Sequence, residues 1–397
     1  MPRVLSIATL YPNAHVPRFG TFVARQLEAL AARGDWEVTV INPIGVPPLP
    51  MGRYKALARA AVSGTEGGVD VHRPRFTLIP AVGGPINPAL IARRILPLAR
   101  KLHAAQPFDL VDAQFFYPDG PAAARVASDL GLPLSIKARG ADISHWGHRP
   151  STLRQMQAAA RQAKGLLAVS AALRDDMAAI GLPADKVTVH YTGLDRDLFH
   201  PHDRAEARRQ LAQDCNLPLA PGERLLASVG ALIPRKGQEF VLRALPTLPD
   251  CHLALVGTGA DREMLDKLAF DLGVSGRVHF LGSMDHGMLP VVLSAADAMV
   301  LPSASEGLAN AWVEALACGT PLVITDAGGA RELVRSPKAG RIVGRNAEAI
   351  AAGVREVLAA DYAPADVAAE VAQFSWQANA AALADYYARL IAPQPTP

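Results

Sequence analysis

The chain has 397 residues, which is too long for one ordinary hydrophobic core, so we expect two domains. Half of its residues are hydrophobic and 19% are charged, as in a globular α/β protein with a buried sheet. Its cysteines have neither CxxC spacing nor neighbouring histidines, so we expect buried thiols in a reducing cytosol rather than disulfides or a metal site: Cys215, Cys251 and Cys318.

The net charge of +3 hides an uneven distribution. Residues 1–190 hold 22 Lys and Arg against 13 Asp and Glu, whereas residues 191–397 hold 18 against 24. A basic first half suits anionic lipid or a phosphorylated acceptor, although solvated arginines would give the same balance. Nucleic acid is not expected as a partner, because no recognised nucleic-acid motif or basic and aromatic array accompanies the charge.

The first residues lead directly into a strand pattern instead of a charged and then apolar secretory signal. No uninterrupted apolar stretch approaches the length that crosses a bilayer. We therefore expect a cytoplasmic protein. Its basic first half extends this expectation to peripheral contact with the inner face of the cell membrane.

The chain begins with strand, loop, helix and strand in turn. Residues 3–9 form an apolar run, a loop rich in breakers ends at Gly20, residues 21–33 carry a helical apolar face, and residues 37–41 are β-rich. This order is typical of a doubly wound sheet, in which ligands bind at the carboxyl ends of the strands. The loop lacks a full GxGxxG, so a dinucleotide site is not expected. Residues 43–100 are rich in Pro and Gly, which predicts variable loops and short helices.

Two further apolar runs, residues 108–113 and 133–137, predict buried strands. The second run is followed by Arg139, Gly140 and Asp142. The planar guanidinium of Arg139 is suited to a sugar hydroxyl or a phosphate. Asp142 would either contact the same ligand or cap the next turn.

A charged, proline-containing stretch at 198–222 is expected to cross between the domains. A new strand at 224–229 is followed by Gly230, Arg235 and Lys236 and then by a helix. The glycine lets the backbone approach a ligand, and the two cations can neutralise phosphate charge. This loop therefore predicts a diphosphate site.

The stretch 301–334 predicts strand, loop, helix and strand, with Glu306 at the helix start and Glu314 about two turns further on a neighbouring face. A helix start offers unpaired amides and the positive end of the helix dipole, which stabilise an anion. Carboxylates on either side of a bound phosphate would accept hydrogen bonds from hydroxyls, which fits a nucleotide sugar; two solvated helix glutamates would show the same spacing. The amides expected to hold the phosphate belong to Gly307, Leu308, Ala309 and Asn310.

This stretch resembles the E-x7-E signature of retaining glycosyltransferases of GT-B fold, particularly glycosyltransferase family 4. The matching positions are Pro302, Ser303, Glu306, Gly307, Glu314, Ala315, Ala317, Gly319, Pro321, Gly328, Gly329 and Glu332.

The resemblance extends over essentially the whole chain. Gly20 is similar to the glycine of the family's first loop, and Arg139, Gly140 and Asp142 match its Arg-Gly-x-Asp form. Lys236 matches the family's basic loop. The chain departs from the family at Ala231, where many members carry an arginine, and whether Arg235 replaces it stays open.

The resemblance implies an α/β fold of two doubly wound, Rossmann-like domains facing a central cleft. The expected first domain spans residues 1–195, binds the acceptor and is completed by a terminal helix at about 375–392 that crosses back onto it. The expected second domain spans residues 196–374 and binds the nucleotide sugar.

The implied reaction moves a sugar, with retention, from a nucleoside-diphosphate sugar to a saccharide or lipid-linked acceptor in cell-surface polysaccharide or glycolipid synthesis. It requires no metal or other cofactor. Its catalytic residues are Glu306 on the donor-sugar hydroxyls, Lys236 and Arg235 on the leaving diphosphate, and Arg139 facing the transferred sugar. Glu314 holds the ribose hydroxyls, while Gly20, Asp142 and Gly230 join the helix amides in binding substrate.

Other functions fit parts of the pattern. A nucleotide-sugar epimerase of the same fold would convert the donor without an acceptor. A non-catalytic partner of another transferase would only bind the donor, and Ala231 keeps this alternative open. A phosphorylase would depend on inorganic phosphate.

Overall fold

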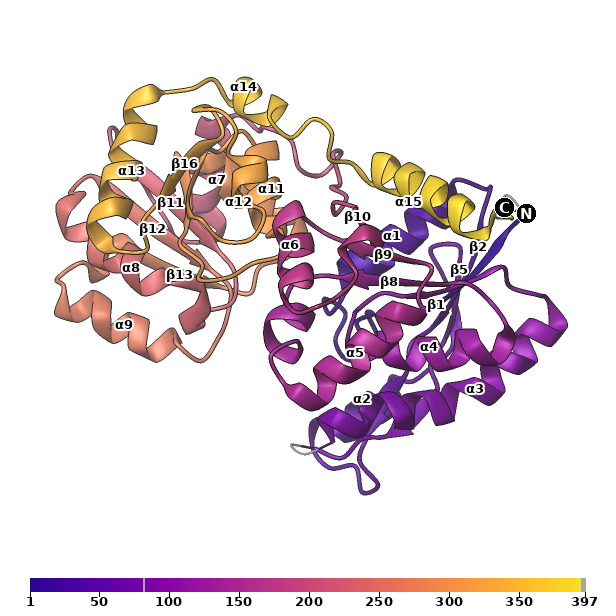
Figure 1. The fold of residues 1–397 in the computed structure, drawn as a ribbon. Helices are drawn as coiled ribbons and strands as arrows, with labels where there is room; N and C mark the ends of the chain where they lie inside the picture. Colours follow the sequence, from indigo (N-terminus) through magenta and orange to yellow (C-terminus); the bar gives the residue numbers. More distant parts are fainter. Residues whose placement is uncertain (81–82, 394–397) are drawn as a thin grey trace. The chain divides into compact units, whose positions relative to one another are not determined.

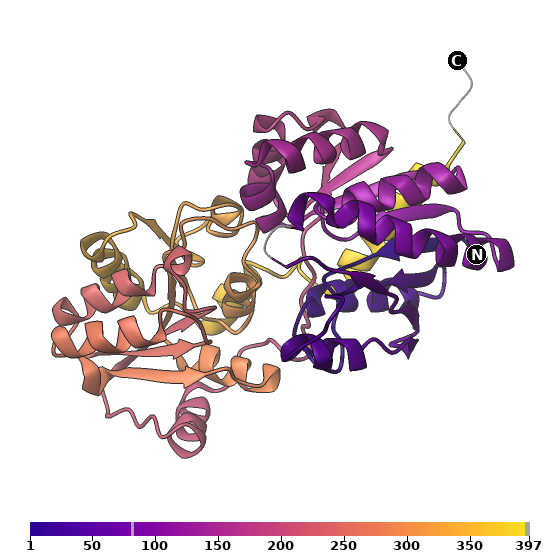
Figure 2. The same cartoon turned by 90° about the horizontal axis from the view of Figure 1, so that it is seen from below.

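The computed structural model describes residues 1–80 and 83–393 and divides the chain into two compact units. Unit 1 comprises Met1–Gly193 and the segment from Trp376 onward, and unit 2 comprises Leu194–Ser375. Each unit is a mainly parallel sheet with helices on both faces (Figures 1 and 2). The expected α/β fold of two doubly wound units is confirmed.

The main sheet of unit 1 has the strand order β10-β9-β8-β7-β1-β2-β5-β4, in which only the β4–β5 pair is antiparallel. The strands β3 and β6 form a separate, two-stranded parallel sheet. The strands are β1 (Arg3–Ile7), β2 (Glu37–Ile41), β3 (Ile44–Val46), β4 (Gly64–Glu66), β5 (Val69–His72), β6 (Arg75–Thr77), β7 (Leu110–Ala113), β8 (Leu134–Ala138), β9 (Gly165–Ala168) and β10 (Val187–Val189).

Helices of unit 1 cover both faces of this sheet, which is why its central strands are buried and mostly apolar. On one face, Leu27 and Leu30 of α1 pack in one cluster with Leu383 and Tyr387 of α15. The helices α3, α4 and α5 pack side by side on the other face. The helices are α1 (Thr21–Ala32), α2 (Arg53–Arg59), α3 (Asn87–Ala105), α4 (Asp119–Leu130), α5 (Pro150–Gln162), α6 (Ala171–Ala179) and α15 (Trp376–Ile391).

The sheet of unit 2 is entirely parallel, in the order β13-β12-β11-β14-β15-β16. Its strands are β11 (Arg224–Val229), β12 (Cys251–Val256), β13 (Val278–Gly282), β14 (Ala298–Leu301), β15 (Leu322–Thr325) and β16 (Gly340–Val343). Its helices are α7 (Arg204–Asp214), α8 (Gln238–Ala244), α9 (Arg262–Asp271), α10 (Leu289–Ala295), α11 (Asn310–Ala317), α12 (Ala330–Leu333), α13 (Ala347–Ala360) and α14 (Pro364–Ala369).

Both sheets reverse their direction of winding once. In unit 1 the chain runs outward from β1 through β2 and then returns to place β7 on the other side of β1. In unit 2 the same reversal places β14 beside β11. Ligands of doubly wound sheets bind outside the carboxyl ends of the strands at such a reversal. The topology therefore directs attention to the loops after β1 and β7 and to those after β11 and β14.

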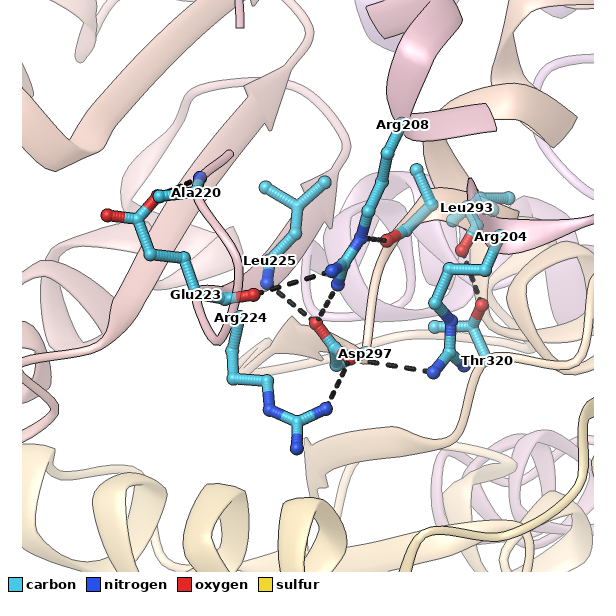
Figure 3. A network of polar contacts seen from close by, with 10 residues as sticks. Arg204, Arg208, Ala220, Glu223, Arg224, Leu225, Leu293, Asp297 and Thr320 are labelled. Atoms are coloured by element: carbon cyan, nitrogen blue, oxygen red, sulfur yellow. Dashed lines mark hydrogen bonds and ion pairs between the residues drawn. The ribbon is translucent and has the colours of Figure 1, made fainter. Parts of the chain in front are cut away.

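Asp297 connects the amino ends of the central strands of the unit 2 sheet (Figure 3). This residue directly precedes β14, and its side chain is buried. Its carboxylate accepts hydrogen bonds from the Leu225 amide at 2.7 Å, from Arg208 Nη2 at 2.5 Å and from Arg224 Nη1 at 3.1 Å. Arg204 Nη1 lies 3.5 Å from the same carboxylate. One aspartate thus links α7 and β11 to the start of β14.

The stretch 198–222 differs from the expected interdomain crossing, because it lies within unit 2 and contains α7. Asp203 caps this helix by accepting a hydrogen bond from the Glu206 amide at 2.8 Å. Only Ala207 and Leu211 of the helix are buried, so its sequence is too polar to show an apolar face. Across residues 1–80 and 83–393, no helix is both long and apolar enough for a membrane crossing.

Candidate active site

The loops that follow β11 and β14 bring two basic side chains onto one carboxylate. Lys236 Nζ lies 2.5 Å from Glu306 Oε1, and Arg235 Nη1 lies 3.3 Å from Glu306 Oε2. Arg235 also donates a hydrogen bond to the carbonyl of Ser305 at 2.5 Å. The Glu306 and Lys236 side chains are only 9% and 13% exposed. Two cations on one carboxylate leave a net positive charge, which suits an anionic ligand.

Gly230 directly follows β11 and lies beside the Lys236 side chain. A Cβ atom at Gly230 would lie 3.9 Å from Lys236 Nζ, so a larger side chain would fill the space next to this cation. The loop after β12 approaches from the other side, where a Cβ at Gly257 would come within 2.0 Å of the Gly230 carbonyl oxygen. Both glycines therefore let backbone lie close to the basic pair.

The Glu306 loop is fixed in place by the segment after β15. Gly328 has a φ of +51°, and a Cβ there would lie 2.1 Å from the Glu306 carbonyl oxygen and 2.6 Å from that of Gly307. The amide of Gly329 donates to the Gly307 carbonyl at 2.8 Å. The Gly-Gly pair of the sequence signature thus supports the backbone that carries Glu306.

Helix α11 starts directly after this loop, at Asn310, which is later than the sequence indicated, since Glu306 was expected at the helix start. Its N-cap residue is Ala309, which has no side chain able to accept from the first amides of the helix. The backbone of Gly307, Leu308, Ala309 and Asn310 therefore stands at the helix start beside Glu306. Whether these amides hold a phosphate stays a prediction.

Glu314 lies within α11 and is half-buried. Its carboxylate has no ion pair or side-chain hydrogen bond among residues 1–80 and 83–393. Burial raises the pKa of Glu314 to about 7. A half-buried carboxylate without a partner in the protein is available to hydroxyl groups of a ligand.

Arg139 follows β8 in unit 1 and is held by a residue that follows β7. Its Nε donates to the Gln114 carbonyl at 2.7 Å, and its Nη2 donates to Gln114 Oε1 at 2.6 Å. The guanidinium carbon lies 4.9 Å from the ring centroid of Phe22 in α1. Burial lowers the pKa of Arg139 to about 10. The guanidinium thus lies at the reversal point of the unit 1 sheet.

Asp142 takes the capping role that the sequence had left open beside ligand contact. Its carboxylate accepts hydrogen bonds from four backbone amides, at 2.8 Å from Phe116, 3.0 Å from Arg139, 2.8 Å from Gly140 and 3.1 Å from Ile143. The side chain is fully buried. Asp142 therefore sets the path of the Arg139 loop.

Gly20 is the N-cap of α1 and has a φ of +74°. A Cβ at this position would lie 2.5 Å from the carbonyl carbon of Leu10, so the start of α1 packs directly on the backbone after β1. No direct role in binding follows from this contact. The candidate residues of unit 1 and unit 2 form one cluster in each unit.

Sequence reasoning did not single out the buried polar residues behind Arg139. Gln114, Lys137 and Gln26 are each no more than 1% exposed. The available signal was a lysine at the end of the mostly apolar stretch 133–137, which was expected to form a buried strand. Among the described ranges, no three His, Cys, Asp or Glu side chains gather closely enough to hold a metal ion.

Family models match most of the chain in two parts. Residues 19–198 match the model described as Glycosyltransferase Family 4, and residues 212–373 match Glycosyl transferases group 1.

Two curated relatives illustrate the similarity in sequence. The putative teichuronic acid biosynthesis glycosyltransferase TuaC of Bacillus subtilis is 28% identical over 360 residues, which cover 89% of this chain and 88% of the relative. The D-inositol 3-phosphate glycosyltransferase of Mycolicibacterium gilvum is 37% identical over 215 residues. This second match covers 52% of the chain and 47% of the relative, so it spans about half the length of the relative.

Solved structures share the fold over nearly the whole chain. Sucrose-phosphate synthase of Thermosynechococcus elongatus has a TM-score of 0.78 at 23% identity, with 98% of this chain and 99% of that one covered. Anabaena HepE in complex with UDP has a TM-score of 0.75 at 21% identity, with 98% and 100% covered. These likenesses show the fold, and the two family models add the family. The chain therefore belongs to the glycosyltransferases of GT-B fold.

Proposed function

We propose that the protein transfers a sugar, with retention, from a nucleoside-diphosphate sugar bound to unit 2 to a hydroxyl acceptor bound to unit 1. The observation that carries the proposal is the ion pair of Lys236 with Glu306 at the reversal point of the unit 2 sheet. The family 4 and group 1 matches support glycosyl transfer in general. Retention and independence from metals rest on the resemblance of the Glu306–Glu314 stretch.

In the proposed complex, Lys236 and Arg235 contact the diphosphate, and the amides from Gly307 to Asn310 lie at the positive end of α11 beside it. Glu306 accepts hydrogen bonds from hydroxyls of the donor sugar. The unpartnered carboxylate of Glu314 accepts from the ribose hydroxyls. The contacts proposed for Lys236 and Arg235 match the positive charge of these side chains beside Glu306.

The proposed reaction forms a bond between the acceptor oxygen and the anomeric carbon. The bond from that carbon to the β-phosphate oxygen breaks, and the acceptor proton passes to the leaving diphosphate on the same face. Lys236 and Arg235 stabilise the charge that develops on this diphosphate, and Arg139 orients the sugar or the acceptor. No pair of carboxylates then has to act as nucleophile and acid, unlike in a retaining glycosidase.

The relatives indicate which substrates to test first. The Anabaena structures contain UDP and UDP-glucose, so a UDP-sugar is our first donor candidate. The TuaC relative is described as acting in teichuronic acid biosynthesis, and the shorter matches are inositol phosphate glycosyltransferases. We therefore propose an acceptor in cell-surface polysaccharide or glycolipid synthesis, either a saccharide or a lipid-linked one.

A melting-shift panel of UDP-, GDP-, ADP- and TDP-sugars on the wild type and on Glu314→Ala tests the donor site. We expect stabilisation by one nucleotide class and its loss in the variant. No shift with any donor would contradict the proposal. An epimerised nucleotide sugar formed without acceptor would instead indicate the epimerase, and a requirement for inorganic phosphate would indicate a phosphorylase.

A surface of unit 1 supports the further proposal of contact with an anionic membrane on the cytoplasmic side. Leu49 and Met51, which are 83% and 78% exposed, precede α2, whose Arg53, Lys55 and Arg59 are also exposed. Apolar side chains beside basic ones suit the boundary of an anionic bilayer. The acceptor would reach unit 1 from this surface.

Sedimentation with vesicles tests the membrane contact. We expect binding to phosphatidylglycerol vesicles at low salt, weaker binding at high salt and little binding to phosphatidylcholine. The variant Arg53→Gln/Lys55→Gln/Arg59→Gln should remain in the supernatant, while exchange of exposed arginines elsewhere, such as Arg331→Gln, should not matter. Equal sedimentation of the triple variant and the wild type would refute the assignment of this surface.

A further inference from the structure

A chain of buried hydrogen bonds runs through unit 1 behind Arg139. The fully buried Lys137 lies on β8, and its Nζ is 2.7 Å from Gln26 Oε1 and 2.6 Å from His190 Nδ1. Gln26 Nε2 in turn donates to Gln114 Oε1 at 3.1 Å. The side chains come from α1, β8 and the segments after β7 and β10. They connect parts of the chain that are distant in sequence.

The direction of each hydrogen bond is determined by the partners at its ends. His190 Nε2 lies 2.9 Å from the carbonyl oxygen of Asn379, which can only accept, so Nε2 carries the proton and Nδ1 accepts from Lys137. Gln26 accepts from Lys137 with its oxygen, and its NH2 group therefore points to Gln114. The hydrogen bonds from Lys137 through Gln26 to Gln114, which we call the relay, thus have one consistent orientation.

The relay ends on the residue that holds Arg139. Gln114 Oε1 accepts from Gln26 and also from Arg139 Nη2, while Gln114 Nε2 donates to Asp112 Oδ2 at 2.5 Å. Both polar atoms of the Gln114 side chain are therefore hydrogen-bonded, Oε1 twice and Nε2 once. Because the Gln114 main-chain oxygen accepts from Arg139 Nε, this one glutamine sets the plane of the guanidinium.

Among residues 1–80 and 83–393, no carboxylate lies within ion-pair distance of Lys137, and burial lowers its pKa and that of His190 well below their usual ranges. A neutral amine has two N–H groups, and Lys137 has two acceptors within reach. An apolar side chain would be cheaper to bury at this position. The polar group therefore needs a reason beyond filling the core, and the orientation of Gln26 supplies one.

The terminal helix α15 is attached to the same relay. The carbonyl of Asn379 accepts from His190, and Asn379 Nδ2 donates to the carbonyl of Tyr191 at 2.6 Å. The start of α15 thus fixes the imidazole that accepts from Lys137. Hydrogen bonds thus connect Gln26, near the start of the chain, through Lys137 and His190 to Asn379 of the terminal helix.

We propose that Lys137 is a positioning residue for glycosyl transfer, which acts through Gln26 and Gln114 on the orientation of the Arg139 guanidinium. The inference rests on the proposed function, because it takes Arg139 to contact the reacting sugar or the acceptor. Lys137 itself is buried and touches no substrate.

The positioning can be measured without any activity. The Nη–H signals of Arg139, which include the proton donated to Gln114 Oε1, are assigned in a 15N NMR spectrum by their loss in Arg139→Lys, and their exchange with water is then followed. In Lys137→Met and in Gln26→Met, which leaves the Lys137–His190 contact intact, we expect exchange to become about 10-fold faster, the size of one lost hydrogen bond. Gln157→Leu, which removes a hydrogen bond to the Ile180 carbonyl on the same unit, is the matched control.

Unchanged exchange in folded Lys137→Met and Gln26→Met would overturn the relay. Gln26→Met keeps the test valid if Lys137→Met does not fold, because it changes no charged group. Equal acceleration in Gln157→Leu would reduce the effect to a general loosening of unit 1 and also overturn it.

Kinetics connect the relay to the reaction. The probe is the nucleotide sugar selected by the melting panel, with the sugar transferred to water. We expect kcat to fall about 10-fold in Lys137→Met and the double variant with Arg139→Lys to match Arg139→Lys alone within about 2-fold. Losses that multiply would indicate a merely structural role. Full activity of Arg139→Lys would show that Arg139 has no role in the reaction. The melting shifts test the donor site of unit 2 separately.

Discussion

Lys236 and Glu306 are 70 residues apart in the chain, yet Nζ of the lysine lies 2.5 Å from Oε1 of the glutamate. The contact forms because the two residues follow β11 and β14, which are neighbours at the reversal point of the unit 2 sheet. The carboxylate thus lies beside the ammonium, at the place where we propose that the diphosphate of the donor binds. A change in the charge of either residue should therefore affect binding of the donor's diphosphate and binding of its sugar differently.

Removal of the ammonium should slow transfer strongly. For Lys236→Ala we expect kcat to fall on the order of 10²-fold or more, because a preorganised charge no longer stabilises the leaving diphosphate. Steady-state kinetics with the donor chosen by the melting panel would measure the effect. Lys338→Ala is the control, since this exposed lysine of unit 2 pairs only with exposed Asp366. A near-normal rate for Lys236→Ala would refute the assignment.

Neutralising Glu306 should have opposite effects on the free diphosphate and on the reaction. In Glu306→Gln, Lys236 and Arg235 lose their shared carboxylate, so we expect UDP to bind a few-fold more tightly, on the order of 1 kcal/mol. Transfer should fall, because the donor-sugar hydroxyls lose a charged acceptor. Calorimetry with UDP and kinetics with the sugar donor separate the two effects. Weaker binding of UDP would show that Glu306 does not compete with the diphosphate.

The glycine behind the Glu306 loop should not tolerate a side chain. In Gly328→Ala the new Cβ would lie 2.1 Å from the Glu306 carbonyl oxygen, and the φ of +51° adds strain. We expect a loss of more than about 1 kcal/mol in the free energy of unfolding and a loss of donor binding. Gly276→Ala is the control, because its Cβ would meet open space and should leave both unchanged. Equal behaviour of the two variants would show that the Glu306 loop is not held by Gly328.

The buried carboxylate of Glu314 should make stability depend on pH. Its pKa is about 7 in the folded protein and 4.5 without burial, so the folded state binds the proton more tightly. Stability from this group is therefore full below pH 4.5 and is lost as pH rises through 7. Glu314→Gln should be the more stable protein above pH 7, by about 3 kcal/mol or less, and should match the wild type near pH 4.5.

Urea unfolding of wild type and Glu314→Gln at several pH values would measure this difference. Asp119, whose pKa burial also raises to about 7, remains in both proteins and cancels in the comparison. The same variant should lose its melting shift with nucleotide sugars, because a neutral amide replaces the charged acceptor for the ribose hydroxyls. A pH-independent difference in stability would mean that Glu314 is solvated like an ordinary helix glutamate.

Much of unit 2 could be predicted because its strands are continuous apolar runs and its loops carry local signals. The breaker before Glu306, the glycine at position 230 and the start of α11 at Asn310 are all readable within a few residues. The ion pair of Lys236 with Glu306 was not predicted as a contact. It depends on which strands are neighbours, and strand order is a property of the whole sheet.

Residues that act through distant partners were the ones missed. In the sequence, Lys137 marks only the end of an expected strand. Its hydrogen bonds to Gln26 and His190 depend on residues that are distant in the chain. For Asp142 both the capping and the ligand role fitted the sequence, and only the four amides around its carboxylate decide between them. Helix α7 was missed because just two of its residues are buried, so its apolar periodicity is weak.

Asp297 should be important for stability rather than for catalysis. In Asp297→Ala, Arg204, Arg208 and Arg224 lose their common carboxylate and the Leu225 amide loses its acceptor. We expect a loss of about 3 kcal/mol in the free energy of unfolding, since an uncompensated charge cluster remains beside the buried start of β14. The arginines are partly exposed, which keeps the loss below the upper end for buried pairs.

Asp326→Ala provides the matched control for this prediction. Asp326 pairs with Arg331 at 2.7 Å, but both side chains are at least half exposed, so its removal should cost less than about 1 kcal/mol. Urea unfolding measures both variants. Donor binding below the melting temperature should be unchanged in Asp297→Ala, because Asp297 precedes β14 while Glu306 follows it at the opposite end of the strand. A stability loss no larger than that of the control would show that the arginines are satisfied by solvent.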